Sequence, residues 1–233
     1  MTEYVEVARA ESARGELVLR RRVQERATDV LELRVNGVFV MDTQETTSEV
    51  ELAALALNLV SDPRDVVVAG LGLGFTVQRV LADARVEQVR VVEIEGALIR
   101  WMRDGTVPHG PALLADKRLH VVEADIATAI TEATSTYDLV LVDVDNGPGY
   151  LVHDDNARLY RQEFLRSTRR ILNPGGAVVV WSASPAPDLR ATMQRVFGSC
   201  SEHTYAVELQ GREEQYLLYL SRPPSVPDSG EGR

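Results

Sequence analysis

Residues 66–75 read Val-Val-Val-Ala-Gly-Leu-Gly-Leu-Gly-Phe, and residues 91–95 read Val-Val-Glu-Ile-Glu. The first stretch predicts a buried strand that turns through three alternating glycines into a helix, and the second predicts a strand with an acid at its tip. Such a turn lets the backbone approach a ligand closely, and the acid at the end of the next strand can hold the two hydroxyls of a ribose. The residues predicted to bind a nucleoside-containing cofactor are therefore Gly70, Gly72, Gly74 and Glu93.

The glycine spacing favours one class of cofactor. A dinucleotide fingerprint places its third glycine three residues after the second, where this chain has Phe75. The pattern Gly-x-Gly-x-Gly fits an S-adenosylmethionine turn better, so a nicotinamide oxidoreductase is disfavoured. Glu93 suits either cofactor, because its separation from the glycine turn is close to the roughly 20 residues that normally separate such a turn from the acid that binds the ribose. The alternative is a glycine turn that packs a helix on a sheet and binds nothing.

Strand and helix patterns alternate from residue 65 onward. Short apolar runs that suit buried parallel strands occur at 66–69, 89–94, 119–123, 139–142 and 177–181. Helices are predicted between them, notably at 75–83, 96–104, 157–172 and 189–197. Two further strands, 205–209 and 214–220, predict an antiparallel hairpin at the sheet edge. The predicted fold class is α/β, with a Rossmann-like, doubly wound and mostly parallel sheet that ends in a C-terminal antiparallel hairpin.

The first fifty residues have a different pattern. Residues 16–19 and 30–35 alternate apolar and polar, and Asn36-Gly37 joins the second run to 38–41 as a type I′ hairpin would. A helix is expected to begin near Thr47. We therefore predict three units: a small N-terminal β-hairpin unit over 1–48, a class I methyltransferase-like domain over 49–222, and a disordered tail over 223–233.

Acids also follow other predicted strands. Ligands of a doubly wound sheet lie beyond the carboxyl ends of its strands. Asp125 is predicted to accept the adenine amino group; the alternative is an N-cap on the next helix, and one residue can do both. Asp143 is the candidate catalytic base, which would bind an ammonium group or take its proton. Repulsion among the carboxylates of the loop that follows is expected to raise one pKa for that task.

The segment after Asp143 supplies the predicted substrate contacts. Asp145 and Tyr150 lie in the loop, and Tyr160 lies where the next helix is expected to begin. Asp154 and Asp155 are interpreted as solvated turn residues.

A metal site is not predicted. Residues 143–146, Asp-Val-Asp-Asn, are similar to the Asp-x-Asp segment of cation-dependent catechol-type O-methyltransferases. Those enzymes complete the site with an Asp-Asn pair after the next strand, where residues 181–184 of this chain read Trp-Ser-Ala-Ser. The oxygen coordination of a hard cation would therefore be incomplete, and the four histidines show no ligand spacing.

Composition limits the partners. The chain has 233 residues, of which 45% are hydrophobic and 26% charged, as in ordinary soluble proteins. Its formal net charge of −10 disfavours nucleic acid and anionic membranes and favours a small cationic amine. The single cysteine, the absence of a signal-like start and the absence of a membrane-spanning apolar run predict a cytoplasmic protein. Exposed edges of the N-terminal strands allow pairing across a two-fold axis, as in a homodimer.

With these segments placed, the chain resembles the spermidine synthase family, a branch of the class I methyltransferase fold that transfers an aminopropyl group from decarboxylated S-adenosylmethionine. The resemblance covers about residues 15–223 and rests on the glycine motif and on 92–95, 142–143, 159–164 and 173–176. It implies a nucleoside pocket beside an amine pocket.

Three departures from the family fall where aminopropyl transfer needs residues. Leu73 stands where the family's glycine turn has an aspartate, and residues 48–52 lack the family's Tyr-His-Glu segment. Asp145 follows Asp143 by two positions instead of three. The resemblance therefore implies an intact nucleoside pocket and an altered diamine pocket.

The main interpretation is an S-adenosylmethionine-dependent transferase that moves a methyl group to a small, amine-bearing molecule. One alternative is a spermidine synthase-like aminopropyltransferase that uses decarboxylated S-adenosylmethionine. Another is a non-catalytic homologue that binds the cofactor or a partner and has lost the acceptor site.

Overall fold

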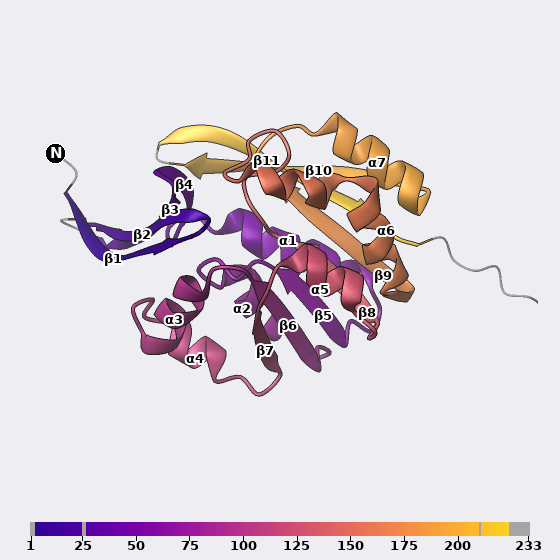
Figure 1. The fold of residues 1–233 in the computed structure, drawn as a ribbon, viewed down its shortest axis with the longest axis horizontal. Coiled ribbons are helices and arrows are strands. Elements are labelled where there is room, and N and C mark those ends of the chain that lie inside the picture. The colour runs from indigo at the N-terminus through magenta and orange to yellow at the C-terminus, as the bar shows by residue number, and fades with distance from the viewer. Residues whose placement is uncertain (1–2, 25–26, 210, 224–233) are drawn as a thin grey trace, which may run out of the picture.

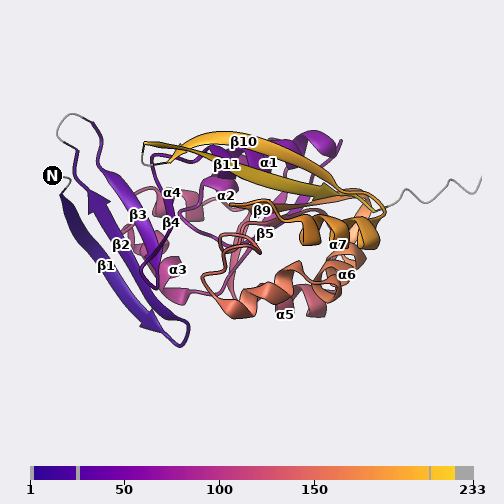
Figure 2. The same cartoon turned by 90° about the horizontal axis from the view of Figure 1, so that it is seen from above.

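The computed structural model describes residues 3–24, 27–209 and 211–223. It contains a four-stranded sheet of order β1-β2-β3-β4 and a seven-stranded sheet of order β10-β11-β9-β8-β5-β6-β7. Figure 1 shows helices on both sides of the larger sheet, and Figure 2 shows the N-terminal sheet as a separate layer at one end of the molecule. The tail predicted over 223–233 lies, from residue 224 onward, outside the described residues.

The N-terminal sheet comprises β1 (Tyr4–Ser12), β2 (Gly15–Arg22), β3 (Val30–Val35) and β4 (Val38–Asp42). Asn36 and Gly37, with φ of 52° and 76°, make the tight turn between β3 and β4 that the sequence predicts. Strand β1 is not predicted from the sequence, because its residues are exposed or half-buried along its whole length and show no core face. On the inner face of the sheet, Leu17, Leu19 and Leu33 join the core of the larger domain.

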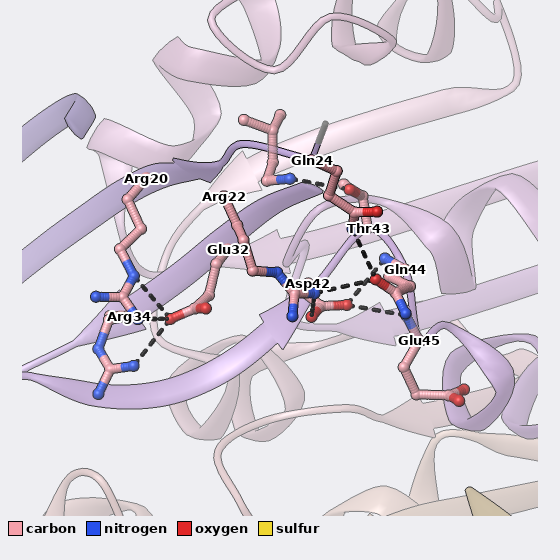
Figure 3. Close-up of polar contacts among 10 residues, drawn as sticks. Arg20, Arg22, Gln24, Glu32, Arg34, Asp42, Thr43, Gln44 and Glu45 are labelled. Carbon is pink, nitrogen blue, oxygen red and sulfur yellow. Dashed lines mark hydrogen bonds and ion pairs between the residues drawn. The ribbon is translucent and has the colours of Figure 1, made fainter. Parts of the chain in front are cut away.

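The opposite face of this sheet buries two carboxylates among arginines (Figure 3). Glu32 is fully buried, and its Oε1 lies 2.6 Å from Arg20 Nη2 and 2.8 Å from Arg34 Nη1. Asp42 is opposite Glu32 on β4, lies 3.4 Å from Arg22, and accepts two backbone amides of the turn that leads toward the first helix. Because a buried charge without its partner is costly, these pairs fix β2, β3 and β4 to one another.

The larger sheet has the predicted topology. Its parallel strands are β5 (Asp65–Ala69), β6 (Gln88–Glu93), β7 (Leu119–Glu123), β8 (Tyr137–Val142) and β9 (Leu172–Ser182). The last two strands, β10 (Ser201–Leu209) and β11 (Arg212–Ser221), form the predicted antiparallel hairpin, and β11 pairs with β9. The strand order reverses between β5 and β8, which is where doubly wound sheets bind ligands.

Helices cover the two faces of this sheet (Figures 1 and 2). One face packs on α1 (Thr47–Leu59), α2 (Phe75–Leu81), α3 (Gly96–Asp104) and α4 (Gly110–Leu114). The other packs on α5 (Ile126–Glu132), α6 (Gln162–Arg170) and α7 (Pro187–Phe197). Successive strand residues alternate between the two cores: Val66 and Val68 belong to the first, and Val67 and Ala69 to the second. The predicted fold class is confirmed.

The helix predicted over 157–172 is shorter in the structure. A 3₁₀ turn, η1 (Asp154–Tyr160), comes first, and the extended backbone of Arg161 separates it from α6. Strand β9 then begins at Leu172 and runs through residues 173–176, Asn-Pro-Gly-Gly, which the sequence assigned to a turn. An irregularity in the β8–β9 pairing accommodates this segment, because proline is tolerated in a strand at a bulge.

Within the described ranges, no helix is both long enough and apolar enough to cross a membrane.

Candidate active site

The glycine turn brings three parts of the molecule together. Gly70 has φ of 92°, and a Cβ at this position would lie 2.3 Å from the carbonyl oxygen of Asp143. Gly72 has φ of 51°, and a Cβ there would lie 2.7 Å from Met41 Sδ. Only glycine fits both positions without a shift, so β5, β8 and the N-terminal sheet meet at this turn.

A cavity of about 140 Å³, here called the glycine-turn cavity, opens beside the turn. Six of the predicted site residues line it from the ends of four strands, β5 to β8: Gly70, Gly72, Glu93, Asp125, Asp143 and Asp145. Leu17, Leu33 and other residues of the N-terminal sheet provide an apolar wall. Gly74 does not line the cavity; it is the N-cap of α2.

Glu93 supports the turn through both carboxylate oxygens. Its Oε2 accepts the Leu71 amide at 2.8 Å, and its Oε1 accepts the Glu95 amide at 2.7 Å. Burial raises the pKa of Glu93, and these hydrogen bonds oppose the rise. Each carboxylate oxygen can accept a second hydrogen bond, so Glu93 can also accept hydrogen bonds from the hydroxyls of a ribose. Its role as a ribose ligand stays a prediction.

Asp125 is the N-cap of α5, the alternative that its sequence position allowed. Its Oδ1 accepts the Ala127 amide at 3.0 Å, and its Oδ2 lies 2.5 Å from Arg158 Nη2. It also lines the glycine-turn cavity, so the cap does not compete with a contact to adenine. The adenine contact itself stays a prediction.

Three buried polar atoms that line the same cavity have no hydrogen-bond partner among the described residues: Arg14 Nε, Glu95 Oε1 and His153 Nε2. Arg14 reaches the cavity from the β1–β2 turn, and its Nε lies 3.4 Å from Glu95 Oε1. Buried polar groups in proteins normally have partners, so the cavity suits a ligand with polar edges. The sequence does not predict Arg14 as a site residue, because only tertiary packing brings the turn between β1 and β2 to this cavity.

A second, smaller cavity of about 60 Å³, here called the acidic cavity, adjoins the first. The two share Val40, Gly72, Asp143 and Asp145. The acidic cavity is also lined by Glu45 and Glu49 near the start of α1 and by aromatic residues that include Phe39, Trp181 and Tyr216. In the part of the chain that the structure describes, no lysine, arginine or histidine lines this cavity.

Asp143 and Glu49 form an electrostatic pair in this cavity. Thr76 Oγ1 donates to Asp143 Oδ2 at 2.6 Å, and burial raises the pKa of Asp143 to about 6 against this hydrogen bond. Ser48 Oγ donates to Glu49 Oε2 at 2.7 Å. Burial, followed by the nearby charge of Asp143, raises the pKa of Glu49 to about 7. The sequence attributed a raised pKa to the loop acids after Asp143, whereas burial is the main cause and Glu49 is the interacting neighbour.

The predicted substrate residues lie in different surroundings. The Asp145 carboxylate accepts four hydrogen bonds from the loop that follows it, and its φ is 63°. The buried Tyr160 hydroxyl donates to Val144 O at 2.9 Å, and Tyr150 is 59% exposed. Asp145 lines both cavities, whereas Tyr150 and Tyr160 line neither. The hydrogen bonds of Asp145 and Tyr160 within the loop are enough to explain the positions of both side chains. The substrate contacts of Asp145, Tyr150 and Tyr160 stay predictions.

Leu73, which departs from the family's aspartate, is fully buried and lines neither cavity. Its carbonyl oxygen lies 2.6 Å from His109 Nε2. In the described part of the chain, no group of three or more His, Cys, Asp or Glu residues is placed to hold a metal ion.

Glu49→Gln is expected to stabilise the protein at pH 8 and to have little effect at pH 4. The pKa of Glu49 is raised in the folded state, so its contribution to stability is complete below the ordinary pKa and is lost as pH rises through about 7. Glutamine stays neutral and avoids this loss of stability. The loss is at most about 3 kcal/mol, because each pKa unit corresponds to about 1.36 kcal/mol. Urea unfolding at both pH values measures the effect, with Glu51→Gln of the same helix as the control. An equal change at both pH values would contradict it.

Residues 45–207 match the model of the family described as Spermine/spermidine synthase domain. The chain belongs to this family. The match confirms the family to which the sequence motifs pointed, and most of the residues that line each of the two cavities lie within the matched range.

Named relatives of this spermine/spermidine synthase family member are aminopropyltransferases. The polyamine aminopropyltransferase of Saccharolobus islandicus is 29% identical over 164 residues, which cover 67% of this chain and 54% of the relative. Polyamine aminopropyltransferase 2 of Hyperthermus butylicus is 31% identical over 145 residues, which cover 58% of this chain and 45% of the relative. The chain thus spans about half the length of these curated relatives. Their names favour aminopropyl transfer, our alternative, over the methyl transfer that we placed first.

Solved structures agree on the fold. A spermidine synthase in complex with the transition state analogue AdoDATO superimposes with a TM-score of 0.78 over 93% of this chain and 73% of that chain, at 16% identity. The spermidine synthase from Thermotoga maritima gives a TM-score of 0.74 over 93% and 71%, also at 16% identity.

Proposed function

We propose that this chain transfers an aminopropyl group from decarboxylated S-adenosylmethionine to a small amine. The observation that carries the proposal is that a cavity suited to a nucleoside and a cavity lined by carboxylates meet at Asp143. A nucleoside donor in the first cavity and a cationic acceptor in the second would place the reacting atoms at that junction. Much of the rate enhancement would come from this positioning.

The residues divide into a donor group and an acceptor group. Backbone at Gly70 and Gly72, with Glu93 and Asp125, would hold the nucleoside, and Arg14 and Glu95 offer further polar contacts. The carboxylates of the acidic cavity would hold the ammonium of the acceptor and take its proton. The bound donor supplies a carbon activated by its sulfonium: the amine nitrogen bonds to this carbon, the carbon–sulfur bond breaks, and sulfur keeps the electron pair as a neutral thioether.

The identity of the leaving nucleoside tests the proposal. Purified protein is incubated with decarboxylated or intact S-adenosylmethionine and with a panel of monoamines, diamines and longer polyamines, and products are identified by mass spectrometry. We expect 5′-methylthioadenosine and an aminopropylated amine from the decarboxylated donor. S-adenosylhomocysteine from the intact donor would instead support methyl transfer. Calorimetric binding without either product would support the non-catalytic homologue.

Cytoplasmic location, assembly as a homodimer and the exclusion of nucleic acid remain predictions from the sequence.

A further inference from the structure

Two carboxylates from distant parts of the chain face the acidic cavity. Glu49 lies in the first turn of α1 and is 8% exposed, and Asp143 follows β8. Each has one oxygen held by a hydroxyl, Ser48 Oγ for Glu49 and Thr76 Oγ1 for Asp143. Both carboxylates are therefore fixed in place while the cavity between them stays open to a ligand.

Among the described residues that line this cavity, no side chain supplies a compensating positive charge. The other titratable groups that line the cavity are Glu45 before α1, Asp145 after β8 and Tyr216 of β11, and burial raises the pKa of Tyr216 to about 12. Two carboxylates that line one small cavity and interact electrostatically cannot both be ionised without a cost, so they favour either a proton or a cationic ligand. An alkylammonium group supplies the cation.

The two carboxylates differ in their relation to the donor. Asp143 lines both cavities, so a sulfonium bound in the glycine-turn cavity would favour its ionised form, as the Thr76 hydrogen bond already does. Glu49 lines only the acidic cavity and lacks this influence.

We propose that Glu49 is the group that accepts the proton of the acceptor amine, while ionised Asp143 holds the nitrogen at the junction of the two cavities. The inference rests on the proposed function and revises the sequence-based assignment of Asp143 as the base. The higher pKa of Glu49 is consistent with it, because a stronger base takes the proton more readily.

The step balances in protons and electrons. One N–H bond of the alkylammonium breaks, and its proton forms an O–H bond on Glu49. The freed electron pair of nitrogen forms the new N–C bond as the C–S bond of the donor breaks. The secondary ammonium product keeps its two remaining protons, and Glu49 later releases its proton to water.

An acceptor that needs no base tests this role. Turnover with decarboxylated S-adenosylmethionine is compared for an alkylamine and for the same amine with fluorine atoms beside the amino carbon, which is neutral at pH 7.5. With the ordinary amine, Glu49→Gln is expected to lower kcat by about 100-fold and to change the acceptor KM little. With the fluorinated amine the loss is expected to fall below about fivefold. Asp143→Asn is expected to lose activity with both acceptors, because positive charge develops on nitrogen as the N–C bond forms with either amine, and asparagine lacks the negative charge that stabilises it.

Two controls separate the outcomes. Glu51→Gln, on the same helix and outside the cavity, is expected to behave as wild type with both acceptors. If Glu49→Gln loses activity equally with both acceptors, or loses none, the proposal is wrong although the transferase function stands. If the wild type transfers nothing from the decarboxylated donor, the proposed function itself fails.

The wild type keeps the proposal testable even if Glu49→Gln does not fold. In the wild type, the rate with the ordinary amine should fall as pH drops below about 7, whereas the rate with the fluorinated amine should stay level down to about pH 6. Parallel profiles for the two amines would overturn the role of Glu49.

Discussion

Asp143→Asn is expected to lower kcat/KM for the amine acceptor by about 10²- to 10³-fold while donor affinity stays within about threefold of wild type. Asparagine keeps the size of the side chain, and its amide oxygen can still accept the Thr76 hydroxyl. It removes the negative charge at the one acidic position that directly follows β8 and lines both cavities. Loss of one partner from a buried charge pair costs about 2–5 kcal/mol, which covers the expected range.

Steady-state kinetics with the acceptor varied, together with calorimetric titration of the donor, measures both parts of this expectation. Asp155→Asn is the matched control, because Asp155 is an exposed acid on the same segment and lines neither cavity. An Asp143→Asn enzyme with wild-type kcat/KM would show that the acceptor binds elsewhere. A protein that loses donor binding as well would place Asp143 in the donor site instead.

The sequence predicts those features of this fold that depend on local pattern. Alternating glycines after a run of valines define the turn beside the cavity, and the limits of α3, residues 96–104, agree between sequence and structure. The apolar strands and the terminal hairpin are also visible, because each carries its own periodicity. Local reasoning is less reliable at residues 173–176: Pro-Gly-Gly normally ends an element, and only pairing with β8 keeps this segment in a strand.

The candidate site is predictable only where it is built from strand ends. Gly70, Gly72, Glu93, Asp125 and Asp143 line one cavity because the carboxyl ends of parallel strands share an edge of the sheet. Asp145 shows the limit of this rule, since its loop hydrogen bonds become apparent only when the chain is folded.

Other site residues carry no sequence signal for their position. Arg14 and Glu49 reach the cavities through the packing of the N-terminal sheet and of α1, which involves long-range contacts. The pKa of Asp143 likewise depends on burial, and no spacing of acids along the chain reveals it.

Gly70→Ala is expected to abolish measurable donor binding and to lower the free energy of unfolding by about 3 kcal/mol or more. The left-handed backbone at φ of 92° costs an alanine about 1–2 kcal/mol. The added Cβ would also lie 2.3 Å from the carbonyl oxygen of Asp143, which is backbone and cannot rotate away. To relieve this clash, the end of β8 must move away from β5. That movement displaces Asp143, which lines both cavities.

Gly175→Ala separates the two contributions. Gly175 has φ of 81°, close to that of Gly70, but a Cβ there would meet nothing within 4 Å. Its cost should therefore be the backbone strain alone, about 1–2 kcal/mol, with donor binding unchanged. Urea unfolding and calorimetric titration of the two variants give the comparison. If the two variants are equally destabilised, the backbone at Asp143 moves aside at little cost in free energy. If Gly70→Ala keeps its affinity for the donor, the glycine turn is not part of the donor site. A larger loss of stability and of donor affinity in Gly70→Ala than in Gly175→Ala would show that the close approach of β5 to β8 keeps the donor and acceptor cavities correctly placed relative to each other.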